Sequence, residues 1–274
     1  MLHKKITFIG AGNMASSIIS GLIKDGYPSD FICASEPSAE TTNKLVQQLG
    51  INGSQDNNAS ATWAEVIVLA VKPQIMAVVC QALVDAGVDF SNKLVISIAA
   101  GISVNRLQTI LGENTAVIRA MPNTPALLQK GMTGLFASAQ VNTENKTFAE
   151  QLMQAVGEMI WVDKESMIDA VIAASGSAPA YFFLFMEAMH AKATQMGFTD
   201  EQAKQLVLQT ALGSAQMVEQ NPDISLTTLR ENVTSKGGST AEAIKTFNEH
   251  GLSETVAKAM QAAADRGAEM ESLF

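Results

Sequence analysis

The chain is most informative at residues 6–15, which read ITFIGAGNMA. A short β-branched and aromatic run over residues 6–9 leads into a glycine turn, and a helical pattern follows it. Gly10 allows a tight turn, Gly12 lets the backbone approach a pyrophosphate, and Ala15 keeps the helix close to the strand. The stretch predicts the first turn of a dinucleotide-binding fold. A glycine turn without a ligand is the alternative interpretation.

Other apolar runs of strand length follow, separated by helical patterns. The runs are continuous rather than alternating, which is typical of strands buried on both faces of a parallel sheet. The expected fold class is therefore α/β, with an N-terminal Rossmann-type doubly wound sheet. We expect strands at 6–9, 31–34, 66–71 and 94–98, weaker strands at 117–119, 134–136 and 159–162, and helices near 13–25, 38–49, 74–85, 103–111 and 144–156.

The pattern changes near Asp163, after which no strand is expected. Thr199 and Gln202 predict a capping box that opens a helix over 200–219. Gly197 and Gly251 would each close a helix. We expect a dinucleotide-binding domain over 1–162 and an all-helical domain over 163–274, whose apolar faces form either a dimer interface or its own core. In 200–219 the residues that share one face are Ala203, Leu206, Val207, Ala211, Ser214, Met217 and Val218.

Composition excludes several classes of protein. The 274 residues suit two unequal domains. The net charge of −9, with no basic cluster, argues against a nucleic-acid partner. Cys33 and Cys80 are too few for a disulfide scaffold or a metal cluster, so no metal is expected. No apolar run approaches the ~18 residues of a membrane span, and the start is too short for a signal peptide. We expect a soluble cytoplasmic protein.

Three loops after expected strands are candidates for cofactor contacts, because ligands bind beyond the carboxyl ends of such strands. Glu36 could accept hydrogen bonds from a ribose 2′-hydroxyl and favour NAD, whereas Ser35 could donate to a 2′-phosphate. The local sequence therefore leaves both NAD and NADP as alternatives. The other two loops are 70–73 (AVKP) and 121–125 (MPNTP), and each could also be a purely structural turn.

The helical part contains one chemically informative segment, residues 235–242, which read SKGGSTAE. Ser239 and Glu242 match a capping box, which predicts a helix from Thr240. The two glycines before it would free backbone amides to bind an anion such as a small carboxylate. The alternative is an ordinary capped helix. The loop 175–179 (SGSAP) is expected only to separate successive helices.

Together these motifs resemble the pyrroline-5-carboxylate reductase family along nearly the whole chain. The matching segments occur in order at 9–15 (IGAGNMA), 70–73 (AVKP), 97–101 (SIAAG), 119–125 (RAMPNTP), 175–181 (SGSAPAY) and 229–240 (LRENVTSKGGST). The resemblance implies reduction of 1-pyrroline-5-carboxylate to L-proline by NADPH, with NADH as an alternative. It also implies a homodimer, possibly assembled into a decamer, in which a neighbouring subunit completes each site.

The resemblance implies roles for individual residues. Thr240 would be the catalytic group, orienting the imine and supporting protonation of its nitrogen. Lys236 departs from the family's usual proline. The cofactor would contact Gly10, Ala11, Gly12, Asn13, Met14, Ser35, Glu36, Asn57, Ala70, Val71, Lys72, Pro73 and Asn123, and the substrate would contact Ser235, Gly237, Gly238, Ser239 and Thr240.

Two other functions are alternatives to this reductase. A β-hydroxyacid-dehydrogenase-like enzyme would need a catalytic lysine early in the second domain, and 170–186 contains none. A dinucleotide-binding regulatory module would bind the cofactor but would not turn over the imine.

Overall fold

The computed structural model describes residues 3–273, so Met1 and Leu2 lie outside the described part. The chain forms two compact units, which we call the sheet unit (Met1–Ser177 with Ala262–Phe274) and the helical unit (Ala178–Gln261). This division differs from the boundary expected after Val162, because residues 163–177 and the end of the last helix pack with the sheet.

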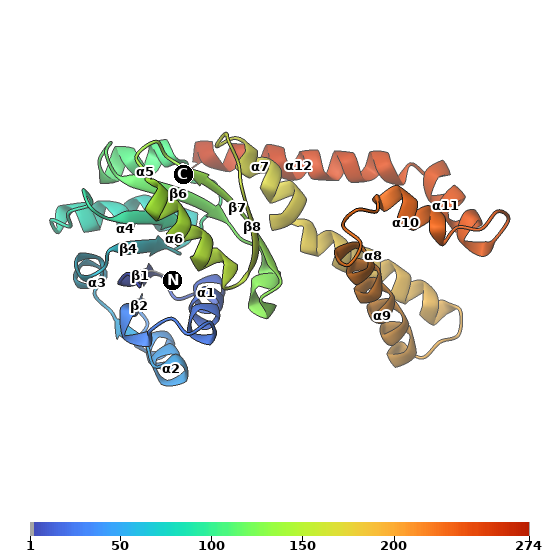
Figure 1. Cartoon of the computed structure of the whole chain (residues 1–274), viewed down its shortest axis with the longest axis horizontal. Coiled ribbons are helices and arrows are strands. Elements are labelled where there is room, and N and C mark those ends of the chain that lie inside the picture. Colours follow the sequence, from blue (N-terminus) through green and yellow to red (C-terminus); the bar gives the residue numbers. More distant parts are fainter. Residues whose placement is uncertain (1–2, 274) are drawn as a thin grey trace. The chain divides into compact units, whose positions relative to one another are not determined.

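The sheet unit is built on eight strands in the order β3-β2-β1-β4-β5-β6-β7-β8 (Figure 1). All neighbouring strands are parallel except β6 and β7. The first six positions reproduce the 3-2-1-4-5-6 order of dinucleotide-binding folds, which confirms the expected Rossmann-type sheet. The strands are β1 Ile6–Ile9, β2 Ile32–Ser35, β3 Asn52–Ser54, β4 Val66–Leu69, β5 Leu94–Ser97, β6 Ala116–Met121, β7 Gly131–Ala137 and β8 Gly157–Trp161.

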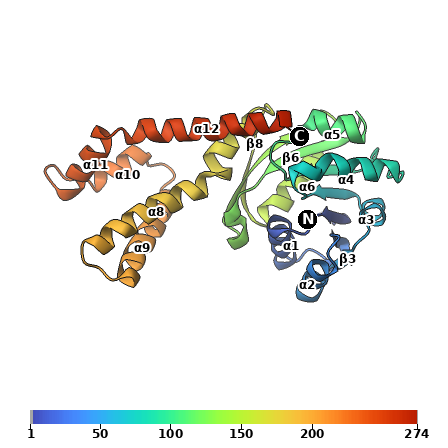
Figure 2. The same cartoon turned by 180° about the vertical axis from the view of Figure 1, so that it is seen from behind.

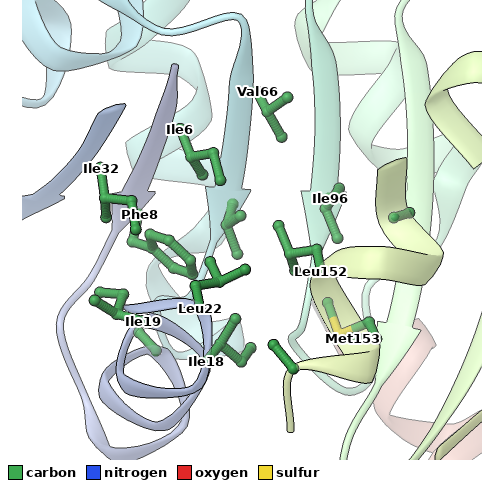
Figure 3. Packing of buried hydrophobic residues seen from close by; sticks show 14 of the residues in the cluster. Ile6, Phe8, Ile18, Ile19, Leu22, Ile32, Val66, Ile96, Leu152 and Met153 are labelled. Atoms are coloured by element: carbon green, nitrogen blue, oxygen red, sulfur yellow. The ribbon is translucent and has the colours of Figure 1, made fainter. Parts of the chain in front are cut away.

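Helices cover both faces of the sheet, so its strands are apolar at successive positions. Phe8 packs into one core cluster and the next residue, Ile9, into the other, because side chains alternate between faces. On the first face, Ile18 and Leu22 of α1 lie against β1 (Figure 3). Helices α1, α2 and α6 contribute to this cluster, and α3, α4 and α5 to the other. The helices are α1 Asn13–Lys24, α2 Ala39–Leu49, α3 Asn57–Trp63, α4 Pro73–Asp85, α5 Val104–Leu111 and α6 Thr143–Gln154, with 3-10 turns η1 Ser29–Phe31 and η2 Thr124–Leu128.

The expected strands and helices of this unit are present, with ends shifted by a few residues. Sequence reasoning missed β3 and α3, because both are short and polar. It also gave no sign that β7 runs antiparallel to β6. The reversal needs only the short η2 connection, whereas parallel neighbours need a long crossover.

The last part of the sheet unit closes around a buried arginine. Arg119 on β6 is 2% exposed and pairs with Glu165 at 2.7 Å and with Glu271 near the chain end. Glu165 also accepts a hydrogen bond from the Val104 amide. A Cβ atom on Gly101 would lie 2.7 Å from Cβ of Met270, so the terminal helix packs tightly on that loop. The elements involved are α7 Met167–Val171, a π-helical turn η3 Ile172–Gly176 and the end of α12 Leu252–Leu273.

The helical unit contains four helices and the first part of α12. Thr199 and Gln202 form the expected capping box at the start of α9, with both reciprocal hydrogen bonds present. Gly197 and Gly251 follow α8 and α11, as expected. The helices are α8 Ala178–Gln195, α9 Asp200–Glu219, α10 Leu226–Asn232 and α11 Ser239–Glu249 (Figures 1 and 2).

One capping prediction in this unit is wrong. Helix α11 begins at Ser239, its N-cap is Gly238, and no side chain caps it. Ser239 therefore sits one position inside the helix, where its hydroxyl cannot take the N-cap role expected for it. The expected S-x-x-E capping box does not form, and the first amides of α11 keep no side-chain acceptor from the cap position.

The helical unit buries few of its apolar side chains. Within it only Ala178, Ala203 and Val207 are buried, and of the face expected on α9 the residues Leu206, Met217 and Val218 stay exposed. The run Met167–Gln195 is long and apolar enough to cross a membrane by length and composition, with 28% of the tested window buried. This finding contradicts the expectation that no apolar run of the chain approaches the length of a membrane span. Apolar core helices of soluble proteins pass the same test.

Candidate active site

The turn between β1 and α1 is held by its neighbours on both sides. Gly10 has φ +97°, a conformation that favours glycine, and its amide donates to the Ser35 carbonyl at 2.8 Å. A Cβ atom at this position would lie 2.7 Å from the carbonyl oxygen of Ala70. Gly10 is therefore required by the close approach of the ends of β2 and β4. The turn lies where the strand order reverses, between β1 and β4.

Beyond that turn the surroundings of Gly12 are open. Apart from its chain neighbours and its own helix, nothing lies within 4 Å of a Cβ built on Gly12, and Gly12 is the N-cap of α1 without a side-chain cap. Ala15, in the first turn, is buried. A helix start with uncapped amides and free space in front of it fits a phosphate group. The residues present therefore fit a dinucleotide.

A second cluster forms where β2 ends. The Glu36 carboxylate accepts a hydrogen bond from the Ala11 amide at 3.1 Å. The buried Ser35 hydroxyl donates to Oδ1 of Asn57 at 2.6 Å. The structure therefore brings together two pairs of residues beside the glycine turn: Glu36 and Ala11, 25 positions apart in the sequence, and Ser35 and Asn57, 22 positions apart.

Residues at the end of β4 are the third segment at this edge of the sheet. The Ala70 amide donates to the Ile9 carbonyl at 2.9 Å, so residues 70–73 lie beside the glycine turn. Lys72 is the N-cap of α4 and Pro73 its first residue, which is a favourable place for proline. Predicted cofactor residues from three separate segments thus share one edge of the sheet.

Asn123 differs from the other predicted cofactor residues. Its side chain is buried, and its amide nitrogen donates to the carbonyl oxygen and hydroxyl of Ser175 at 3.2 and 3.1 Å. Its amide oxygen accepts from the Met132 amide at 2.9 Å. Sequence analysis assigned the loop of Ser175 to helix punctuation and missed this contact, since residues 52 positions apart give no pairing signal.

In the helical unit, residues 235–240 form a tight turn that leads into α11. The Gly238 amide donates to the Ser235 carbonyl at 3.0 Å, and Gly237 at the third position has φ +72°. Thr240 is the second residue of α11 and is half-buried. Its hydroxyl has no hydrogen-bond partner within the described residues 3–273. A hydroxyl and uncapped amides at one helix start can bind a small anion with a polar ring atom.

The structure provides no activated thiol near these turns. Burial raises the pKa of the Cys33 thiol, and it raises that of Cys80 to about 12. Thiols that stay protonated are poor nucleophiles. Over the described residues, no group of three or more His, Cys, Asp and Glu side chains could hold a metal ion. The arrangement is suited to binding and orienting ligands rather than to covalent catalysis.

Comparisons with known proteins match both units. The family model of pyrroline-5-carboxylate reductase dimerisation matches residues 165–270, and that of coenzyme F420-dependent NADP oxidoreductase matches residues 5–101. The chain is 58% identical to the pyrroline-5-carboxylate reductase of Vibrio alginolyticus, with all of both chains covered.

Solved structures agree with these matches. The pyrroline-5-carboxylate reductase of Coxiella burnetii has 42% identity and a TM-score of 0.93, covering 98% of this chain and 99% of that one. The pyrroline carboxylate reductase of Plasmodium falciparum, solved with NADP bound, has 29% identity and a TM-score of 0.87, covering 99% of each chain.

Proposed function

The chain belongs to the pyrroline-5-carboxylate reductase family, and we propose how its residues carry out the family's reaction, the NAD(P)H-dependent reduction of 1-pyrroline-5-carboxylate to L-proline. One structural observation carries the proposal: each unit presents a glycine-bearing turn that opens an uncapped helix, at α1 and at α11. Cofactor and substrate are both anions, and such turns bind anions. We assign the first turn to the cofactor and the second to the substrate.

The sheet unit holds the cofactor. Gly10, Gly12 and the first amides of α1 would hold the pyrophosphate, and Ser35, Glu36 and Asn57 would surround the adenosine ribose. Reduced nicotinamide, when bound, supplies the hydride that converts the C=N bond into an amine. The protein's contribution is orientation of the two reacting atoms, which can lower the barrier by ~7–11 kcal/mol. The remaining assigned contacts are Ala11, Asn13, Met14, Ala70, Val71, Lys72 and Pro73.

The helical unit holds the substrate. We assign the carboxylate to the amides and hydroxyls of Ser235, Gly237, Gly238 and Ser239, where the uncapped start of α11 favours negative charge. Thr240 lies in the first turn, so its hydroxyl can donate to the ring nitrogen. As a neutral donor it orients the imine and supports protonation of the nitrogen as the amine forms.

Replacing Thr240 tests this assignment. We expect Thr240→Ala to lower kcat by up to about 10²-fold. Positioned proton donors contribute typically ~10²–10⁴-fold, and a neutral hydroxyl lies at or below the low end of that range. Thr240→Ser should keep most activity. The measurement is loss of nicotinamide absorbance with 1-pyrroline-5-carboxylate. Thr246→Ala is a matched control, since its hydroxyl bonds the Glu242 carbonyl of the same helix. A raised KM with unchanged kcat would reduce Thr240 to a binding residue.

Glu36 adjusts the choice between NADPH and NADH. Its carboxylate bonds the Ala11 amide, so it lies near the position assigned to the ribose. A carboxylate there repels a 2′-phosphate and accepts hydrogen bonds from a 2′-hydroxyl. We propose that NADPH is used and that NADH is an alternative because Glu36 restrains the NADPH preference.

The test is Glu36→Ala, with Glu40→Ala on the neighbouring helix as its control. We expect the ratio of kcat/KM for NADPH to that for NADH to rise about tenfold, the equivalent of ~1.4 kcal/mol of relieved repulsion. An unchanged ratio in kinetics with both cofactors would mean that Glu36 points away from the ribose in the complex.

The active species is a homodimer, possibly assembled into a decamer, and residues 163–274 form its dimerisation and substrate-binding domain. Two observations support this: the dimerisation model matches residues 165–270, and the helical unit leaves large apolar side chains exposed. Closed two-fold dimers are the commonest soluble oligomers. We further propose a cytoplasmic enzyme that needs no metal and has no nucleic-acid or membrane partner, as expected for the acidic composition and the bacterial relatives.

A further inference from the structure

Three segments of the sheet unit meet in a ring of hydrogen bonds around one side-chain amide. The segments are the loop after β6, the start of β7 and the π-helical turn η3. Asn123 donates to Ser175, Met132 donates to Asn123, and the Ser175 hydroxyl closes the ring on the Met132 carbonyl at 3.4 Å. The ring therefore joins parts of the chain that are 9, 43 and 52 residues apart.

The hydrogen-bonding capacity of Asn123 is largely used inside the protein. A side-chain amide has two donor hydrogens and one oxygen acceptor. Both donor contacts go to Ser175, one to its carbonyl and one to its hydroxyl, and the oxygen accepts from Met132. The side chain is also buried. Asn123 is therefore placed to hold protein segments together rather than to donate to a ligand.

The turn that this ring holds is unusual. Residues Ile172–Gly176 form a π-helical turn, closed by the Ser177 amide donating to the Ile172 carbonyl at 2.8 Å. π turns are rare and frequently mark functional sites. The turn lies tightly on the loop after β6, since a Cβ on Gly176 would be 2.9 Å from Cε of Met121. Packing against Met121 therefore holds the turn at Gly176, and the hydrogen-bond ring holds it at Ser175.

The ring lies at the edge where the cofactor is assigned. Parallel strands β1, β4, β5 and β6 end at one edge, and Asn123 lies two residues after β6. The two halves of such a sheet each take one mononucleotide. Because Glu36 follows β2, the adenosine half would lie over β1 to β3. The nicotinamide half would then lie over β4 to β6, beside residues 121–124.

We propose that Asn123 and Ser175 are positioning residues that fix the loop after β6 and the turn η3 in the geometry needed for hydride transfer. This inference rests on the proposed function. It replaces a direct side-chain contact of Asn123 with the cofactor by an action through Ser175 and Met132. Its consequence is that loss of the ring misplaces the reacting groups while the pyrophosphate and ribose contacts, which are made by other segments, stay intact.

The experiment compares Asn123→Ala, Ser175→Ala and the double variant with the wild type. The readouts are kcat and KM for 1-pyrroline-5-carboxylate, the NADPH Kd from fluorescence titration, and Tm. We expect each single variant to lower kcat by up to about 10²-fold, the effect of a misplacement near 1 Å, while the NADPH Kd stays close to that of the wild type. The double variant should lose little more than one single variant, since the residues act as a unit.

Ser175→Thr keeps the hydroxyl and should restore kcat, whereas Asn123→Asp removes the donor and should not. Ser175→Ala keeps the proposal testable if the Asn123 variants do not fold. A rise in NADPH Kd that accounts for the lost activity would overturn the proposal in favour of direct cofactor contact. A lower Tm with unchanged kcat would leave only a structural role. Wild-type turnover of the imine is measured first, so failure of the proposed function is seen separately.

Discussion

The sheet unit and the helical unit bury apolar side chains to very different extents. In the sheet unit, Phe8 and Leu69 are fully buried on opposite faces of the sheet. In the helical unit, Phe182 and Phe183 on α8 are 69% and 62% exposed. Exposed apolar surface on this scale marks an interaction site. The difference teaches that the sheet unit has its own core, whereas the helical unit leaves much of its apolar surface uncovered, which is the surface that the proposed dimer would bury.

The glycine turns of the two units also differ in how many main-chain hydrogen bonds hold them. The turn before α1, which we assign to the cofactor, is held by main-chain bonds to the ends of two neighbouring strands: the Gly10 amide donates to the Ser35 carbonyl, and the Ala70 amide donates to the Ile9 carbonyl. The turn before α11 is held by one internal bond, from Gly238 to Ser235. A loop with few partners is easier to deform and more dependent on its surroundings. The geometry of the turn before α11, which we assign to the substrate, should therefore depend on oligomer assembly more than the geometry of the turn before α1 does.

The largest expected effect comes from a charge on the exposed face of α8. Phe183→Glu should weaken the dimer by about 3–5 kcal/mol, or roughly 10²–10⁴-fold in its dissociation constant, because an interface would bury an unpaired carboxylate. Activity should fall with the dimer. Sedimentation at assay concentration measures the change against the 29.0 kDa monomer.

Val78→Glu is the matched control for this variant. Val78 is 70% exposed on α4 of the sheet unit, so it presents similar apolar exposure without belonging to the helical unit. We expect Val78→Glu to leave assembly and activity unchanged. Equal losses in both variants, or full activity in a monomeric Phe183→Glu protein, would remove the distinction between the two units.

A smaller effect is expected from the buried charges of the sheet unit. Burial raises the pKa of the Asp169 carboxyl, Glu271 and Glu165 add to the rise, and Arg119 opposes it. Its buried oxygen Oδ1 has no hydrogen-bond partner within residues 3–273. The folded state therefore binds this proton more tightly than the unfolded state, whose carboxyl keeps its ordinary pKa near 3.8.

The sign of the pH effect follows from this difference. Between the unfolded and the folded pKa the native state holds more protons, so stability falls as pH rises through that window, and the cost is complete above it. Asp169→Asn removes the ionisation, so Tm at neutral pH should rise and depend less on pH. The control is Asp265→Asn, which makes the same substitution at another aspartate, on α12. A lower Tm at neutral pH would show that the Asp169 charge is stabilising.

The smallest effect is expected in the substrate turn. Lys236 precedes Gly237, whose positive φ is that of the third residue of a type II turn, and proline is favoured at the second position. Lys236→Pro should stabilise the protein by about 0.4–1 kcal/mol by restricting the unfolded chain. Denaturant unfolding measures this change, and the substrate KM reports any effect of the lost positive charge. A destabilised variant would mean that residue 236 does not adopt the φ of proline.

Much of the fold follows from local sequence. Continuous apolar runs such as 66–69 predicted the central strands, and the glycine turn at 10–12 predicted the first turn of a dinucleotide-binding fold. The Thr199 capping box was also predicted, because both partners lie within one helical turn. Features missed were short or polar, as with β3 and α3. The cap at Ser239 was wrong by one residue, since Gly238 can take the N-cap position as well.

The sequence by itself determined the Rossmann-type sheet, the helical C-terminal part and the two glycine-bearing turns, because each depends on residues within a few positions of one another. Only the tertiary structure decided that Glu36 bonds Ala11, that Arg119 joins Glu165 and Glu271, and that Asn123 bonds Ser175. It also decided which helical faces stay exposed. These features depend on segments brought together by packing, and spacing along the chain carries no record of which polar groups will meet there.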